Sequence, residues 1–354
     1  MHYRLTLFLL AGSLTGETLT QLDVTRIVSF GDSLSDMGNI DDAPVSNGPA
    51  WIDYLSRDHL GLGASVASLE EGHNYSYAGA DTGQSSDDLP TPSAAQQIEL
   101  FAASDGTLSA NDLVTLWIGG NDFLNDADNP TPPDTLYNRY DAILRRLIGL
   151  GARNVFWGLL PDPGLLPPYI NSENRPAYSA FAANVNEKIR ALESEIEAEF
   201  PDVFIILFDY HTLQAEIVAR PGDYGVSDPT VEIPDNADVS NAFLMPDGVH
   251  PTTKGHQIIA SDAYQTILAA LADETSVHSP GIMSFEMPKS GEATLTFATE
   301  TGQDYVVESS YDLSNWQPLS GTLTANSTSS TFTDSSNRPP APKKFYRVRQ
   351  SSSE

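Results

Sequence analysis

The chain has 354 residues, of which 40% are hydrophobic and 19% are charged, a composition typical of globular proteins. Its length allows one large core and a smaller second domain. The formal net charge of −30 argues against nucleic acid or an anionic membrane as a partner, because the field of the protein repels phosphate, and the lack of cysteine excludes disulfides, thiolate metal sites and a cysteine nucleophile.

The first twenty residues have the features of an export signal. Residues 2–16 contain a positive charge at Arg4, then a short apolar run, then small residues. This run is too short to span a bilayer, and no other stretch of the sequence reaches the needed length. We therefore predict a signal peptide over residues 1–20 and a secreted protein, in the extracellular space, in the periplasm or at the cell surface. A strand or helix of the mature fold is the alternative for this segment.

Strand and helix patterns alternate over the next 250 residues or so. Short apolar runs, most of which end at Gly, Pro or Asp, favour buried strands, and longer amphipathic segments favour helices. The alternation predicts an α/β sandwich over residues 21–278. The strands are expected at residues 25–30, 113–118, 154–160 and 203–208, and the helices at 136–150, 175–200 and about 253–272.

The pattern changes after Pro280. Ser- and Thr-rich segments with alternating hydrophobicity follow one another, with turn residues between them, which predicts a small antiparallel β-sandwich over residues 279–354. Residues 306–319 and 343–349 resemble C-terminal β modules of many secreted bacterial proteins. This module could serve in surface or polysaccharide attachment, or only stabilise the protein. Four aromatic residues form either a sugar platform or part of the core: Tyr305, Tyr311, Trp316 and Tyr346.

The sharpest motif is Gly31-Asp32-Ser33-Leu34 at the end of the first expected strand. A serine at a strand-to-helix turn presents its hydroxyl at the carboxyl edge of the sheet, where open α/β folds bind ligands. We expect a helix directly behind it, whose N-terminus would favour a developing oxyanion. Since Gly, Asp and Ser are also common in turns and caps, the motif alone is compatible with a nucleophile or with an ordinary structural turn. Asp32 and Asp36 are better explained as capping residues.

Two further segments favour chemistry at this edge. Gly119-Gly120-Asn121-Asp122 follows the second expected strand, and Asp247 precedes His250 by three residues in the segment 245–251. A serine hydroxyl becomes a good nucleophile only when an imidazole takes its proton and a carboxylate orients that imidazole. The Asp-x-x-His segment can supply both groups from one turn.

Together these blocks resemble the GDSL or SGNH hydrolase family, in particular its bacterial lipase, esterase and hemolysin-like phospholipase branch. The resemblance implies a three-layer α/β/α, flavodoxin-like parallel sheet, with Ser33 as nucleophile, His250 as base and Asp247 as its orienting acid. It also implies an oxyanion hole formed by the backbone N–H groups of Ser33 and Gly79 and by the Asn121 side chain. Gly79 is taken from the segment 74–80, and Gly83 is the alternative. No cofactor and no metal are implied.

The expected activity is cleavage of carboxylic esters, of short-chain acyl groups or of lipids, through an acyl-enzyme. The expected substrate is a small-molecule, lipid or acylated-glycan ester. Carbohydrate acetyl esterase and acyltransferase activities on the same site are alternatives, and a non-catalytic surface-binding protein is a further one.

Other residues carry weaker hypotheses. His256 follows His250 by six residues, but positions i and i+6 do not share a helix face, so a core role is favoured over a metal pair. Asp122 belongs either to the site or to a turn. The loops 125–134 and 161–171 are expected to overhang the sheet edge. Four aromatic residues form either an acyl pocket or, more commonly, core: Trp117, Phe123, Trp157 and Tyr169.

Overall fold

The protein consists of two compact units, Met1–Leu268 and Ala269–Glu354. A computed structural model describes residues 24–83, 91–104, 106–276, 282–286, 292–299, 301–310, 316–335 and 344–350. The predicted signal peptide over residues 1–20 lies outside these ranges. The division between the two units falls inside the last helix of the first unit, before the predicted domain boundary at residue 278.

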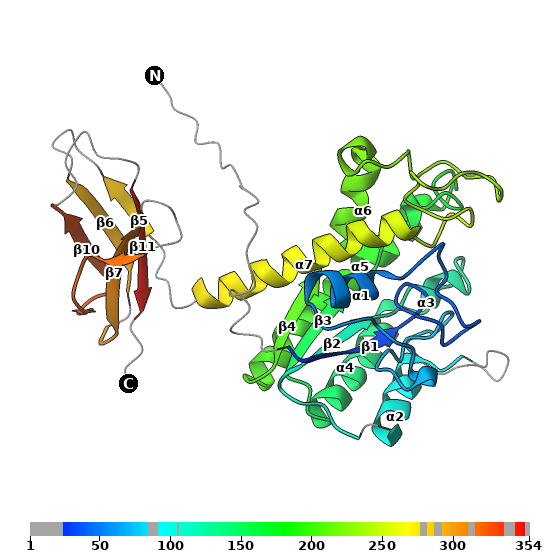
Figure 1. The fold of residues 1–354 in the computed structure, drawn as a ribbon, viewed down its shortest axis with the longest axis horizontal. Helices are drawn as coiled ribbons and strands as arrows, with labels where there is room; N and C mark the ends of the chain where they lie inside the picture. Colours follow the sequence, from blue (N-terminus) through cyan, green and yellow to red (C-terminus); the bar gives the residue numbers. More distant parts are fainter. Residues whose placement is uncertain are drawn as a thin grey trace. The chain divides into compact units, whose positions relative to one another are not determined.

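The first unit is built on a four-stranded parallel sheet (Figure 1). Its strands follow one another across the sheet in chain order, so their carboxyl ends meet at one edge, where Gly31 is level with Trp117. Residues 73–77 continue the sheet beyond the first strand, because Ser29 forms a parallel bridge with Asn74. The strands are β1 (Arg26–Gly31), β2 (Asp112–Trp117), β3 (Asn154–Gly158) and β4 (Phe204–Phe208).

Helices cover both faces of this sheet, which confirms the predicted three-layer α/β/α fold. Helices α2 and α4 lie on one side and α1 and α7 on the other (Figure 1). On the second side the buried Trp51 ring packs 5.5 Å from Trp117 and 5.7 Å from Phe156. The helices are α1 (Trp51–Tyr54), α2 (Ala94–Ser104), α3 (Asn121–Leu124), α4 (Pro133–Gly149), α5 (Arg175–Glu199), α6 (Tyr210–Ala219) and α7 (Thr253–Ser276).

The expectation of a helix directly behind Ser33 is wrong. Residues 32–35 form a turn, and α1 begins only at Trp51. The physical reason lies in Asp36, whose carboxylate accepts hydrogen bonds from the N–H groups of Gly38 (2.9 Å) and Asn39 (2.7 Å). These N–H groups are thereby lost to a helical ladder, and Gly38 turns the chain away with a φ of +114°.

The second unit contains two antiparallel sheets, which confirms a smaller all-β domain. One has the order β10-β6-β5, and in the other β7 pairs with β11, β8 and β9. Phe297, Tyr305, Val307, Ala325 and Val348 form its core. The strands are β5 (Ile282–Glu286), β6 (Ala293–Ala298), β7 (Asp304–Ser310), β8 (Gln317–Pro318), β9 (Leu323–Thr324), β10 (Ser329–Asp334) and β11 (Phe345–Gln350).

The four aromatic residues of this unit do not share one environment. Tyr305 is core, Trp316 packs with its ring 4.4 Å from the Arg347 guanidinium, and Tyr346 donates a hydrogen bond of 2.9 Å to Asp334. Tyr311 lies outside the described residues. In the ranges given above, no helix is both long and apolar enough to cross a bilayer.

Candidate active site

Ser33 lies in the turn that follows β1, at the carboxyl edge of the sheet. Gly31 ends the strand where a side chain is not tolerated, because a Cβ there would lie 2.5 Å from the Trp117 carbonyl oxygen. Behind it, the N–H groups of Ser35 and Asp36 both donate to the Asp32 carbonyl at 3.0 Å. The turn therefore holds the Ser33 hydroxyl at a fixed point beyond the strand end.

His250 and Asp247 come from a compact loop ahead of α7. The Met245 N–H donates to the His250 carbonyl at 2.7 Å, and Gly248 takes a φ of +71°, which favours glycine. One oxygen of Asp247 accepts the N–H groups of Val249 (2.8 Å) and His250 (2.9 Å). The other lies 2.8 Å from His250 Nδ1, so the carboxylate fixes both the loop and the ring.

The loop brings the imidazole to the serine. His250 Nε2 lies 2.8 Å from Ser33 Oγ, across 217 positions of sequence. Burial tends to raise the pKa of Asp247, but hydrogen bonds from the His250 ring and from the N–H groups of His250 and Val249 hold it below its ordinary value. An ionised Asp247 accepts a hydrogen bond from the Nδ1–H of His250, which leaves Nε2 unprotonated and able to accept the Ser33 hydroxyl proton.

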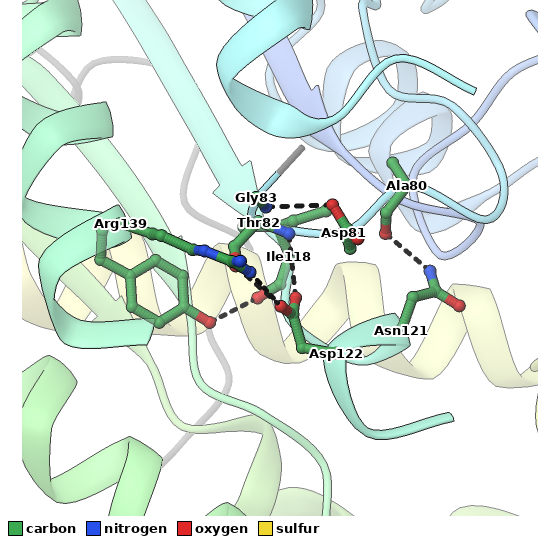
Figure 2. Close-up of polar contacts among 9 residues, drawn as sticks. Ala80, Asp81, Thr82, Gly83, Ile118, Asn121, Asp122 and Arg139 are labelled. Atoms are coloured by element: carbon green, nitrogen blue, oxygen red, sulfur yellow. Dashed lines mark hydrogen bonds and ion pairs between the residues drawn. The ribbon is translucent and has the colours of Figure 1, made fainter. Parts of the chain in front are cut away.

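Asn121 lies in the same cavity wall as Ser33, and Gly79 belongs to the loop that the Asn121 side chain contacts. Asn121 opens α3, and its side-chain amide donates to the Ala80 carbonyl at 2.7 Å (Figure 2). Gly79, one residue earlier, is exposed, takes a φ of +82°, and its N–H donates to no described residue.

Gly83, the alternative, has a different environment. Its N–H donates to Asp81 at 3.0 Å, and a Cβ there would lie 2.2 Å from the Arg139 guanidinium. The Gly83 N–H is therefore already paired, whereas the Gly79 N–H has no partner among the described residues.

A cavity opens beside Ser33. Its free space is about 50 Å³, and Asp32, Asn121 and His250 contribute polar groups to its wall. The remaining wall is largely apolar, which suits the hydrocarbon part of a small ligand. The apolar residues include Leu34, Phe123, Leu124, Leu160, Leu166 and Phe181.

The aromatic residues and loops expected near the site are divided between the cavity and the core. Phe123 lines the cavity, whereas Trp117 and Trp157 are buried core and Tyr169 packs 5.4 Å from the Phe123 ring. The loop 161–171 contributes Pro161, Pro163 and Leu166 to the wall. The loop 125–134, all of which the structure describes, contributes no residue to it.

Two titratable candidates, Asp32 and His256, are buried and bonded to the backbone. Asp32 is buried, with Oδ1 accepting the Leu34 N–H at 3.0 Å, and burial raises its pKa from 3.8 to about 7. His256 is also buried, and its Nδ1 accepts the Trp51 N–H at 3.1 Å, which explains it as a core residue. The described part of the chain has no group of three or more His, Asp or Glu side chains arranged to hold a metal ion.

One residue that supports the site carries no sequence signal. Gln97 of α2 is buried, and its amide accepts from the Gly31 N–H (3.0 Å) and donates to the Gly31 carbonyl (2.8 Å). This pair fixes the end of β1 two residues before Ser33. A glutamine inside an amphipathic helix belongs to no motif, so only the three-dimensional contact identifies it.

Comparisons with known proteins agree on one family. The model of the GDSL-like lipase/acylhydrolase family matches residues 27–263, which include Ser33, Asn121, Asp247 and His250. Thermolabile hemolysin of Vibrio parahaemolyticus is 28% identical over 273 residues, which are 67% of this chain and 62% of the hemolysin. Phosphatidylcholine-sterol acyltransferase of Aeromonas hydrophila is 29% identical over 221 residues, 58% of this chain and 64% of that enzyme.

The chain thus spans less than two thirds of the length of these curated relatives. Among solved structures, a lipolytic G-D-S-L family protein from Veillonella parvula is 16% identical, with a TM-score of 0.41 over 68% of this chain and 96% of that one. The family model covers more than half of the residues and includes the sheet edge described above. The chain therefore belongs to the GDSL-like lipase/acylhydrolase family.

Proposed function

We propose that the protein is a serine esterase in which Ser33, His250 and Asp247 form the catalytic triad. The observation that carries this proposal is the continuous hydrogen-bonded series from Asp247 Oδ2 through both His250 ring nitrogens to Ser33 Oγ, with 2.8 Å at each step. Ser33 and His250 lie at the wall of a largely apolar cavity. Catalytic groups held within hydrogen-bond distance are what nucleophilic acyl transfer requires.

In the proposed reaction, Ser33 Oγ attacks the acyl carbonyl carbon while its proton passes to His250 Nε2. The tetrahedral intermediate collapses, the bond to the alcohol oxygen breaks, and His250 protonates the departing alcohol. Water then gives a proton to His250 and attacks the acyl-enzyme, and collapse of the second intermediate releases the acid and restores Ser33. Asp247 holds the ring and stabilises its cationic form throughout.

The proposed oxyanion donors are the N–H groups of Ser33 and Gly79 and the second amide hydrogen of Asn121. Only one of the two Asn121 amide hydrogens is needed for its bond to the Ala80 carbonyl. The N–H groups of Ser33 and Gly79 make no hydrogen bond within the part of the chain that the structure describes. Donors of this kind are used most strongly when negative charge develops on the substrate oxygen.

The cavity supports an ester with a short acyl group as substrate. Its free space of about 50 Å³ is small beside the roughly 300–1,000 Å³ of pockets for drug-sized ligands. The proposal therefore predicts higher kcat/KM for p-nitrophenyl acetate and butyrate than for the palmitate. An acetylated polysaccharide would satisfy the same cavity, and measuring acetate release from acetyl-xylan separates these two substrate classes.

Hydrolysis and acyl transfer differ only in the molecule that takes the acyl group from the acyl-enzyme, which is water in the first and an alcohol in the second. The acyltransferase among the relatives keeps the second option open, and the yield of acylated product in water with added alcohol measures the balance. Secretion and surface or polysaccharide attachment through the second unit stay predictions.

The decisive variant is Ser33→Ala, assayed with p-nitrophenyl butyrate and checked for folding by circular dichroism. The expected result is a folded protein whose activity falls by at least about 10³-fold, since the nucleophile is gone. A folded Ser33→Ala variant that retains activity would refute the assignment. A wild type without activity on esters would also refute the proposal: activity on other bonds would then indicate a different enzyme, and no activity at all would indicate a non-catalytic protein.

A further inference from the structure

Two buried carboxylates hold the loop that carries Gly79. The Asp36 carboxylate accepts the N–H of Ala78 at 2.8 Å, and the Asp122 carboxylate accepts the N–H of Thr82 at 2.9 Å. Gly79 lies between these two anchored residues, in a left-handed conformation with a φ of +82°. The short segment 78–82 is therefore fixed from both sides while Gly79 itself stays exposed.

Asp122 makes the more extensive set of contacts, and Figure 2 shows them around its carboxylate. Besides the Thr82 N–H, it accepts the Thr82 hydroxyl at 2.9 Å and the Arg139 guanidinium at 3.0 Å. The same guanidinium nitrogen donates to the Thr82 hydroxyl at 3.2 Å. The Asp122 side chain is fully buried, whereas Arg139 is one third exposed, so the carboxylate depends on these partners for its solvation.

This cluster joins the two proposed sources of oxyanion donors. Asp122 follows Asn121 directly, and the Asn121 amide holds the Ala80 carbonyl of the same loop at 2.7 Å. Helix α4 anchors the other side, because Tyr140 donates to the Ile118 carbonyl at 2.9 Å, just before the two glycines that lead to Asn121. Thr82, Ala80 and Asn121 are thus fixed relative to one another by side chains that need not touch substrate.

We propose that Asp122, together with Thr82 and Arg139, is a positioning group that holds the Gly79 loop against Asn121, so that both oxyanion donors are aligned before the substrate arrives. Asp36 secures the opposite end of the same loop. The inference rests on the proposed esterase function. It assigns to Asp122 a role in the rate of the chemical step rather than in ground-state binding, because oxyanion donors act on charge that develops in the transition state.

The test compares kcat and KM of two variant pairs with p-nitrophenyl butyrate. Asp122→Asn removes the charge and replaces one acceptor oxygen by an amide donor, and Thr82→Val removes the hydroxyl at nearly constant shape. Losing a whole oxyanion donor costs about 10²- to 10³-fold in kcat, so misplacing one is expected to lower kcat by roughly 10- to 100-fold, with KM changed less than about threefold. Thr82→Ser keeps the hydroxyl and is expected to restore most of kcat.

Asp112→Asn is the matched control. Asp112 is also a buried carboxylate that binds an arginine (Arg26, 2.7 Å) and a backbone N–H (Ser109, 2.8 Å), but it lies at the amino end of β2, away from Ser33. We expect Asp112→Asn to lower the melting temperature and to leave kcat within about twofold of the wild type.

The proposal is overturned if Asp122→Asn folds and its kcat is no lower than that of the Asp112→Asn control. If Asp122→Asn does not fold, the same comparison is made with Thr82→Val. The proposal is equally overturned if Thr82→Ser is as impaired as Thr82→Val. A wild-type chain without esterase activity would instead refute the proposed function, and this inference with it, so the two failures are distinguished by the wild-type assay.

Discussion

The stability of Asp32→Asn relative to the wild type should increase as the pH rises from 5 to 8. Asp32 is 3% exposed, and burial raises its pKa from 3.8 to about 7, although the Leu34 N–H and His250 oppose the shift. A carboxyl whose pKa is raised by folding contributes stability below pH 4 that is lost as the pH rises through the interval from 3.8 to about 7. Over this whole interval the loss is about 4 kcal/mol, as an order of magnitude.

Asn at this position titrates nowhere in the interval and can still accept the Leu34 N–H bond, which measures 3.0 Å in the wild type. The advantage of Asp32→Asn over the wild type should therefore grow by about 3 kcal/mol between pH 5 and pH 8. This difference does not depend on the constant cost of burying an amide. In a domain of this size it corresponds to a shift in Tm of roughly 2–4 °C per kcal/mol.

The assay is thermal or urea unfolding of the wild type and of Asp32→Asn at both pH values. Asp126→Asn serves as control, because Asp126 is exposed and its replacement removes the same single charge. An advantage of Asp32→Asn that is equal at pH 5 and pH 8, or that matches the control, would refute the view that a buried, ionised Asp32 destabilises the fold.

Three further predictions concern the triad, the cavity and the second unit. Asp247→Asn should lower kcat by about 10²- to 10⁴-fold, because an amide favours the wrong imidazole tautomer, and steady-state kinetics that show less than a twofold loss would contradict this. Phe181→Ala should enlarge the cavity and raise kcat/KM for longer p-nitrophenyl esters relative to the butyrate. An unchanged dependence of kcat/KM on chain length would speak against the cavity as the acyl site. Lys344→Met leaves the buried Asp334 carboxylate without the ammonium group 2.7 Å away, so it should destabilise the second unit by about 3–5 kcal/mol. Hydrogen exchange should then increase within residues 292–350 and stay unchanged in the first unit, whereas unaltered protection of the second unit would show that the ion pair contributes little.

The sequence alone predicts the framework of the first unit well, because strong periodic patterns coincide with real elements. The amphipathic run over 175–200 corresponds to α5 (Arg175–Glu199), and the helix predicted from Thr253 begins there. The apolar runs at 113–118 and 203–208 correspond to β2 and β4, which are buried on both faces over most of their length. Buried parallel strands and long helices leave the clearest signals in a single sequence.

Features that depend on distant contacts could not be predicted in this way. Gly79 and Gly83 look alike in sequence, and only the structure shows that the Gly83 N–H is already paired with Asp81. The proposed positioning role of Asp122 rests on its contacts with Thr82, 40 positions earlier, and Arg139, 17 positions later, and neither of these residues belongs to a motif. The helix expected behind Ser33 failed for a local reason, since the Asp36 carboxylate takes the N–H groups that a helix would need.

The central claim is that the hydroxyl of Ser33 is the group activated by His250. Labelling with diisopropyl fluorophosphate, followed by peptide mass mapping, tests this directly, because the reagent phosphorylates activated serines. We expect stoichiometric label on the peptide that contains Ser33, with loss of esterase activity at the same rate and labelling slowed at least about 10²-fold in His250→Ala. Label on a different serine, or undiminished activity of a chain fully labelled at Ser33, would contradict the account.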